Sequence, residues 1–113
     1  MADHIKIRPA TGTWVVRAGG AVLGESTRAL ELTEGDYPPV IYFPRDDLSM
    51  VFLDASEAGT TCPYKGEARY YDIVAKSGTI KDAAWSYEDP MPEVAEIGHH
   101  IAFYTSKVTV EEV

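Results

Sequence analysis

Glycine and proline interrupt this chain at short and fairly regular intervals, and this punctuation limits what the chain can fold into. Both residues mark turns, so the segments between them are long enough for strands and too short for most helices. The pattern predicts an all-β domain of short strands packed as antiparallel sheets. The residues concerned are Pro9, Gly12, Gly19, Gly20, Gly24, Gly35, Pro38, Pro39, Pro44, Gly59, Pro63, Gly66, Gly78, Pro90, Pro92 and Gly98.

The segments between the turns have the composition of strands, because they are rich in the β-branched and aromatic residues that fit a pleated surface. Gly19-Gly20 suits a two-residue hairpin turn. One short helix is expected at residues 92–97, where Pro92 fits the first position and Gly98 is expected to end the helix in the left-handed conformation. A second helical turn is expected after Arg45. The expected strands are residues 13–18, 21–24, 29–33, 40–43, 67–74, 83–87, 101–104 and 107–110.

Length and charge set further bounds. A chain of 113 residues is the size of one domain, here residues 1–113, because two cores would leave each half with too little apolar surface to bury. The net charge of −8 disfavours nucleic acid and anionic membranes as partners, because both attract basic surfaces. A single cysteine and the lack of a leader-like or membrane-spanning apolar run lead us to expect a cytoplasmic protein.

Several motifs spread along the chain resemble one family. The sequence Cys62-Pro63-Tyr64-Lys65-Gly66, followed by Ala84-Trp85-Ser86-Tyr87, is similar to the bacterial and fungal family known as domain of unknown function 427. Further matching segments are Leu23-Gly24-Glu25-Ser26, Tyr42-Phe43-Pro44-Arg45 with Asp47, and Ile101-Ala102-Phe103-Tyr104.

This resemblance implies a β-tent architecture, in which two antiparallel sheets meet at an angle. Similar folds occur in methionine sulfoxide reductase B, in formaldehyde-activating enzymes and in ligand-binding modules of the cereblon kind. Many of those proteins hold a structural zinc in paired Cys-x-x-Cys motifs, and this chain departs from that pattern because it has one cysteine. An old label of the family also refers to nucleotidyl transfer, but the chain has no motif that supports such an activity.

Cys62 and Lys65 are the candidate catalytic residues. A thiolate is a strong nucleophile, and Lys65 three residues further on could favour it through its positive charge. The simpler interpretation is a structural cysteine, because free cysteines are often buried and Pro63 restricts Cys62 to an extended conformation. Residues 63–66 are expected to form a hairpin turn in which Gly66 takes a positive φ. The turn's amides beside Lys65 offer an alternative role in binding an anion.

The aromatic residues are the main candidates for a ligand site. Buried tyrosine hydroxyls and indole N–H groups need polar partners, so some of these rings are expected to line a cleft that is open to solvent. The alternative is plain packing of the rings between the sheets. Along 67–74, Tyr70 and Tyr71 should point to opposite faces of the sheet. The predicted ligand-binding residues are Tyr42, Arg45, Cys62, Lys65, Tyr70, Tyr71, Trp85 and Tyr87.

Other candidate chemistry is weaker. Arg45-Asp46-Asp47 could handle a phosphate or act in acid–base chemistry, but the favoured interpretation is that Asp46 or Asp47 caps a helical turn. His99 and His100 are adjacent at an expected strand start, where their side chains point to opposite faces, so we expect no metal site. The chain has no glycine-rich nucleotide motif and no nucleophile-elbow or zinc-protease motif, and no cofactor is predicted.

Three functions remain open at this point. The first is a binding module whose aromatic cleft holds a small molecule or a modified side chain. The second is a small enzyme that uses Cys62 or Lys65 as a nucleophile or as an acid or base. The third is an interaction protein that forms a homodimer through an exposed edge strand.

Overall fold

The computed structural model describes residues 4–113, and these form ten strands and three short 3-10 helices. The elements in chain order are β1 (Ile5–Pro9), β2 (Trp14–Ala18), β3 (Ala21–Ser26), β4 (Leu30–Glu34), β5 (Val40–Pro44), η1 (Arg45–Asp47), η2 (Met50–Phe52), β6 (Leu53–Cys62), β7 (Gly66–Ala75), β8 (Gly78–Ser86), η3 (Pro92–Ile97), β9 (His100–Phe103) and β10 (Thr109–Glu112).

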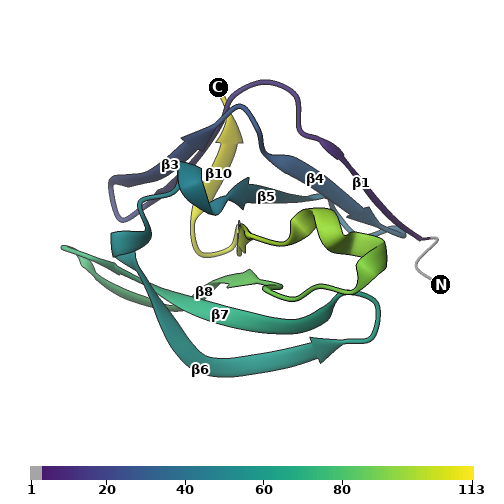
Figure 1. The fold of residues 1–113 in the computed structure, drawn as a ribbon. Helices are drawn as coiled ribbons and strands as arrows, with labels where there is room; N and C mark the ends of the chain where they lie inside the picture. Colours follow the sequence, from purple (N-terminus) through teal and green to yellow (C-terminus); the bar gives the residue numbers. More distant parts are fainter. Residues whose placement is uncertain (1–3) are drawn as a thin grey trace.

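The strands form two sheets in which every pairing is antiparallel. The larger sheet has seven strands in the order β1-β4-β5-β9-β8-β7-β6, and the smaller has three in the order β10-β2-β3. In the larger sheet, β9 joins an arm that carries β1, β4 and β5 to an arm that carries β6, β7 and β8, and the two arms diverge (Figure 1). The predicted all-β class with two antiparallel sheets is confirmed.

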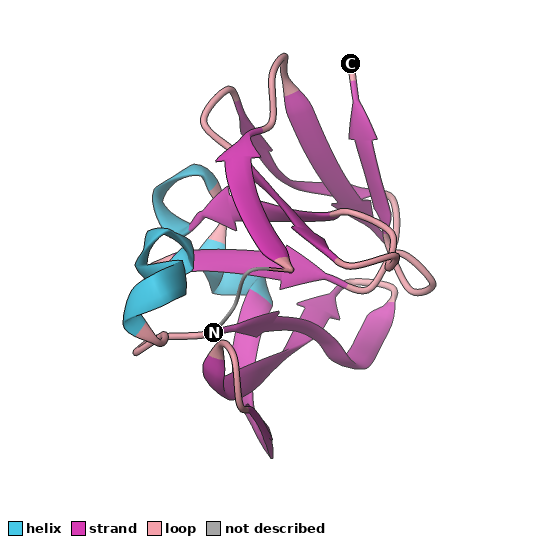
Figure 2. Cartoon of the chain, turned by 90° about the vertical axis from the view of Figure 1, so that its right-hand side faces the viewer, coloured by secondary structure: helices cyan, strands magenta, loops and turns pink. Residues whose placement is uncertain are grey.

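The helical turns lie together on one side of the molecule (Figure 2). The predicted helix has the expected bounds, but η3 is a 3-10 helix with a kink at Val94. The prediction that Gly98 takes the left-handed conformation is wrong, because its φ is −58° while that of His99 is +60°. Gly98 donates its N–H to the carbonyl of Ala95 in an ordinary turn, and the chain reverses one residue later.

The local turn predictions hold where glycine is required. Gly19 and Gly20 have φ values of +56° and +81° and connect β2 to β3 through the pair Ala18 and Ala21. Gly66 has a φ of +115° at the turn between β6 and β7, as expected for residues 63–66. The predicted turn after Arg45 is η1.

Two strands were not predicted. β1 contains the alternating sequence Ile5-Lys6-Ile7 and pairs with β4, and its short apolar pattern gave little signal. β6 is ten residues long, but most of it is alanine, serine, glycine and acidic residues, which have weak strand propensity, and its two threonines are the β-branched exceptions. It forms because β7 offers a paired edge along most of its length.

The core has two parts. One lies between the two sheets and is centred on fully buried side chains of both, such as Val16, Leu23, Phe43 and Ile101. The other covers the opposite face of the larger sheet near η3. Its buried members are Leu32, Tyr42, Ala68, Tyr87, Val94, Ile97 and Ala102.

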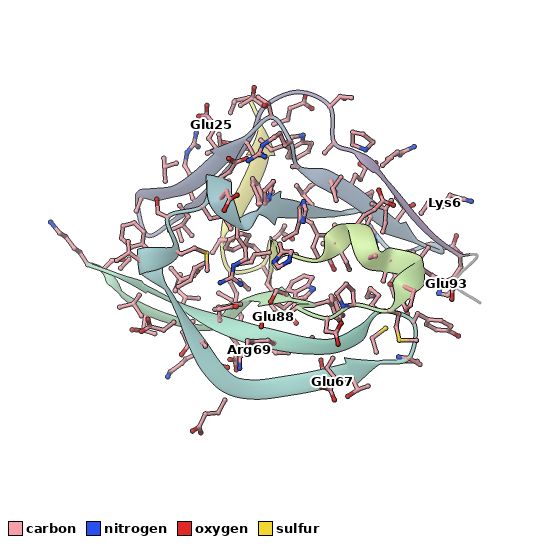
Figure 3. All side chains as sticks on the ribbon, viewed as in Figure 1. Lys6, Glu25, Glu67, Arg69, Glu88 and Glu93 are labelled. Carbon is pink, nitrogen blue, oxygen red and sulfur yellow. The ribbon has the colours of Figure 1, made fainter. Side chains whose placement is uncertain are left out.

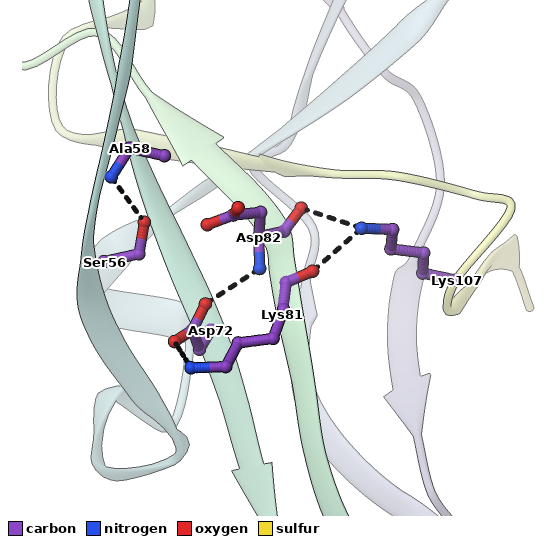
Figure 4. A network of polar contacts seen from close by, with 6 residues as sticks. All are labelled: Ser56, Ala58, Asp72, Lys81, Asp82 and Lys107. Carbon is purple, nitrogen blue, oxygen red and sulfur yellow. Dashed lines mark hydrogen bonds and ion pairs between the residues drawn. The ribbon is translucent and has the colours of Figure 1, made fainter.

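A bulge between β7 and β8 is held by polar contacts (Figure 4). The carboxylate of Asp72 accepts the backbone N–H of Asp82 at 2.8 Å, and Asp82 has a positive φ of 47°. Lys107 Nζ donates to the carbonyl of Lys81 at 2.8 Å from the loop before β10. The extra residues of a bulge lose ladder hydrogen bonds, and these contacts replace them.

Candidate functional site

A cleft of about 810 Å³ lies between aromatic side chains and is here called the aromatic cleft. It is lined by residues from β2, β4, β5, β7, β8, β9 and β10, from the turn before β7 and from the loops after β4, β8 and β9. Its aromatic lining consists of Trp14, Tyr37, Tyr42, Tyr70, Trp85, Tyr87, Phe103 and Tyr104. A volume of this order suits a small organic molecule.

Strand register places the central aromatic residues. Tyr42 on β5 pairs with Ala102 on β9, Ala102 pairs with Trp85 on β8, and Trp85 pairs with Tyr70 on β7. Residues opposite one another in a ladder share one face of a sheet, so these four form a row across four strands. The small Ala102 leaves room for its two large neighbours to meet, and Trp85 Nε1 donates to the Tyr42 hydroxyl at 3.2 Å.

A second aromatic group continues this row at the end of β9. The Tyr104 ring is stacked parallel to that of Tyr70, with centroids 6.4 Å apart, and it lies 4.6 Å from the Trp85 ring. The Tyr70 hydroxyl and the Thr60 hydroxyl lie 3.0 Å apart in a hydrogen bond between β7 and β6. Burial, followed by the hydrogen bond to Tyr70, raises the pKa of Tyr104 to about 12. Tyr104 is therefore a neutral donor at physiological pH.

The cleft also contains a pair of opposite charges. Lys65 is buried although it lies in a turn, and its Nζ donates to the Glu34 carboxylate at 2.5 Å. The ammonium also lies 6.0 Å from the centre of the Tyr87 ring, within the range of a cation–π contact. A buried charge is costly unless it is paired, and Glu34 meets this requirement across 31 positions of sequence.

The surroundings keep two further phenols of the cleft neutral. Burial raises the pKa of Tyr42, and the hydrogen bond from Trp85 only partly opposes that effect. Burial likewise raises the pKa of Tyr87. The lining therefore combines apolar ring faces with neutral hydroxyls, the Lys65–Glu34 pair and the carboxylate of Glu31, which is paired with Arg8. This combination suits a ligand with a flat apolar body and a polar substituent.

The predicted ligand-binding residues are divided among three hollows, of which the second and third adjoin and share Arg69 and Glu88. Tyr42, Lys65, Tyr70, Trp85 and Tyr87 line the aromatic cleft. Arg45 and Tyr71 line a different hollow of about 630 Å³ on another face of the sheet. The split follows from the alternation of β7, which buries Tyr71 and leaves Tyr70 half-buried at the cleft.

The third hollow contains Cys62. This cysteine is free and half-buried, lines the hollow beside Pro63 and Gly66, and packs against the core part that contains Tyr42 and Tyr87. Lys65 turns into the aromatic cleft and pairs with Glu34, so the two candidate catalytic residues do not line a common hollow.

The capping role predicted for Asp46 or Asp47 is wrong. No side chain caps η1, whose N-cap residue is Pro44. Asp47 instead accepts a hydrogen bond from the Ser26 hydroxyl at 2.6 Å and one from Arg28 at 2.9 Å. These bonds, led by the one from Ser26, lower the pKa of the Asp47 carboxyl and tie η1 to the end of β3.

Sequence reasoning missed part of the cleft. Glu34 had no local signal for its partner, because Lys65 meets it only after the two arms of the sheet have formed. Trp14 and Val110 come from the smaller sheet and Tyr37 from the loop after β4, so they reach the cleft through tertiary packing. Within residues 4–113, no three side chains of the His, Cys, Asp and Glu types gather as a metal site would require.

The comparison with known families decides the assignment. A family described as "Domain of unknown function (DUF427)" matches residues 6–113. The chain belongs to the DUF427 family. The match covers every strand of both sheets apart from Ile5 at the start of β1, so the aromatic cleft is built from residues within the DUF427 region. A search of curated proteins found no match. In the part of the chain that the structure describes, no helix has the length and apolar character needed to cross a membrane.

Proposed function

We propose that this DUF427 domain is a binding module whose aromatic cleft holds a small molecule or a modified side chain with a flat apolar part. The observation that carries the proposal is the row Tyr42, Ala102, Trp85 and Tyr70 beside the buried Lys65–Glu34 pair. Ring faces offer a large apolar contact at low entropic cost, and the ion pair offers a donor and an acceptor that fix orientation.

The ion pair also indicates how the cleft would select among ligands. Lys65 is the more enclosed partner, with 11% of its side chain exposed against 22% for Glu34. An anionic substituent would compete with Glu34 for Lys65, while a cationic one would compete with Lys65 for both Glu34 and the Tyr87 ring. A neutral substituent with a donor and an acceptor leaves the pair intact, and we propose this class as the preferred one.

Tryptophan fluorescence tests the proposal directly, because both tryptophans of the chain, Trp14 and Trp85, line the cleft. Titration with toluene, benzamide, benzoate and benzylamine compares four flat molecules that differ in hydrogen bonding and charge. Saturable changes in emission are expected, with benzamide bound more tightly than the two charged compounds. A linear, unsaturated response to all four compounds, together with unchanged melting temperatures, would contradict a small-molecule cleft.

Matched variants separate binding from folding. Lys65→Met removes the charge and keeps most of the aliphatic stem, and it should weaken benzamide binding while leaving toluene binding less affected. Lys6 lies on β1, outside the aromatic cleft, so Lys6→Met serves as the control for loss of one positive charge. Equal effects of both substitutions on benzamide affinity would show that the ion pair does not take part.

The enzymatic alternative remains a second proposal, carried by the half-buried position of Cys62 in the lining of a hollow. Alkylation of the native protein across pH 5 to 9, read by mass spectrometry, tests it, because an activated thiolate reacts well below the ordinary thiol pKa of about 8.5. Reaction only after addition of denaturant would remove the thiol version of this alternative. Lys65 would need to transfer a proton to Glu34 before it could act as a nucleophile.

Self-association is the third proposal, and it rests on the free edge strand β6. This strand pairs with β7 alone, and most of its side chains are exposed. Its register shifts between Ala55 and Gly59, and because such irregularities discourage edge pairing, a homodimer would pair through the regular stretches on either side of the shift. Light scattering at high protein concentration tests for the homodimer, and a monomer mass would exclude it under those conditions.

A further inference from the structure

The hollow that contains Arg45 and Tyr71 differs in chemistry from the aromatic cleft. It is lined by Arg45, Met50, Leu53, Ala55, Arg69, Tyr71, Ser86, Glu88 and His99. Arg69 lies beside Glu88 at the middle of the molecule in Figure 3. Two guanidinium groups, a phenol, a serine hydroxyl and an imidazole therefore face one space, while a single carboxylate accompanies them.

The two arginines share that carboxylate at long range. Arg45 Nη1 lies 3.7 Å and Arg69 Nη1 lies 3.9 Å from the same Oε2 atom of Glu88. Arg8 and Arg28 each have a carboxylate of their own, at 2.6 Å and 2.9 Å. Arg17 is likewise paired with Glu111. The hollow is thus a place of excess positive charge in a chain whose net charge is −8.

Arg45 is held in position by its neighbours. Its Nη1 donates to the Tyr71 hydroxyl at 3.0 Å, and its guanidinium lies 5.8 Å from the centre of the Tyr71 ring. The Tyr71 hydroxyl in turn donates to Glu88 at 2.8 Å. The backbone of Arg45 is anchored as well, because its N–H donates to the carbonyl of His99 at 3.0 Å. A guanidinium held in this way is preorganised to bind an oxyanion.

A further observation at the same hollow points to a missing partner. Ser86 is 1% exposed, and its Oγ is the buried side-chain polar atom of residues 4–113 that has no hydrogen-bond partner. Ser86 also pairs in register with Arg69, so the orphan hydroxyl lies beside that arginine's strand position.

We propose that this hollow binds a small oxyanion, a carboxylate or phosphate group, between Arg45 and Arg69, with Glu88 as the carboxylate that the anion displaces. Glu88 suits this role because about half of its side chain is exposed and it lies on the loop after β8, outside any strand. Arg69 has the freedom to turn toward the anion, since 56% of its side chain is exposed. The site is independent of the aromatic cleft and shares no lining residue with it.

The test is titration of the full chain with sodium phosphate and, separately, with sodium acetate, at constant ionic strength maintained with sodium chloride. Two-dimensional ¹H–¹⁵N spectra report the arginine Nε–H signals and the backbone amides. Saturable shifts are expected at Arg45, Arg69 and Ser86. A tighter response to phosphate assigns a tetrahedral ligand, a tighter response to acetate assigns a planar one, and no saturable shift at these residues with either ion overturns the proposal.

Charge-matched variants decide whether the arginines act as proposed. Arg69→Gln should weaken the binding of the effective ion about tenfold, whereas Arg17→Gln makes the same change in net charge and should leave it unchanged. Glu88→Gln should tighten binding severalfold, because it removes the competing charge and keeps an acceptor for Tyr71. Glu25→Gln is its matched control. Equal affinities of the Glu88→Gln and Glu25→Gln variants would overturn the displacement of Glu88, since a purely structural carboxylate gives no gain.

Discussion

Trp85 donates its indole N–H to the hydroxyl of Tyr42 at 3.2 Å, and the two rings meet edge to face across the small side chain of Ala102. This contact joins β5 to β8, which are not neighbours in the sheet, over the top of β9. It therefore fixes the shape of the aromatic cleft as well as the distance between the two arms of the larger sheet.

Tyr42→Phe should destabilise the protein by about 1 kcal/mol, because the ring remains while the indole N–H loses its acceptor. Tyr37→Phe is the control, since the Tyr37 side chain is exposed and its hydroxyl faces solvent. Urea unfolding followed by tryptophan emission measures both. Equal stabilities of the two variants would show that water replaces the Tyr42 hydroxyl without loss.

Gly24→Ala should destabilise the fold by about 1–3 kcal/mol through overpacking. A Cβ at Gly24 would lie 2.6 Å from both the carbonyl oxygen of Asp47 and the Leu48 side chain, where β3 passes η1. Gly59→Ala is the matched control in another strand, because a Cβ there meets only the Ala68 carbonyl at an ordinary 3.5 Å. Thermal unfolding should show a lower melting temperature for Gly24→Ala than for wild type, and a melting temperature near that of wild type for Gly59→Ala.

Local signals account for the part of the fold that the sequence predicted. Gly19-Gly20 and Gly66 mark hairpins because only a positive φ closes those turns, and that requirement acts within a few residues. β6 escaped prediction because its alanine, serine and glycine residues carry no strand signal, and its pairing with β7 supplies the missing stability. Gly98 and His99 show the same limit of local signals. His99 takes the left-handed conformation, and its carbonyl accepts a hydrogen bond from the N–H of Arg45, which lies far away in sequence.

The sequence identified several of the aromatic residues that line the cleft, but not how all of the chosen residues divide among the hollows. The aromatic residues were recognisable, yet only strand register shows that Tyr42, Trp85 and Tyr70 lie in one row. Alternation along β7 correctly separated Tyr70 from Tyr71, but it could not show that Tyr71 joins Arg45 in a second hollow. Such groupings depend on contacts between residues far apart in sequence.

Alkaline conditions should destabilise the protein through its enclosed phenols. The pKa values of Tyr42, Tyr87 and Tyr104 are raised in the folded state, chiefly by burial. A raised pKa contributes stability that is fully present below the unfolded value of about 10 and is lost as the pH rises toward the folded value. The free energy of unfolding should therefore fall above about pH 10. Tyr42→Phe should show a shallower fall than wild type, and parallel pH profiles would contradict this origin.

Asp72 should give the opposite pH dependence. Its pKa is lowered first by the hydrogen bond from the Asp82 backbone N–H and then by the bond from Lys81, although burial opposes both. A lowered pKa contributes stability that is present above the unfolded value of about 3.9 and is lost as the pH falls through the folded value. Asp72→Asn should thus be less stable than wild type at pH 7, and this difference should shrink below about pH 4.

Thermal unfolding of wild type and Asp72→Asn between pH 7 and pH 2.5 measures that difference. Lys81→Gln is the comparison variant, because it keeps the carboxylate and its backbone donor and removes only an exposed ammonium at 3.4 Å. It should reduce stability less than Asp72→Asn, since exposed ion pairs contribute little. A difference between wild type and Asp72→Asn that stays constant across the pH range would show that the ionised and the protonated carboxyl of Asp72 hold the bulge equally well, and would contradict this origin.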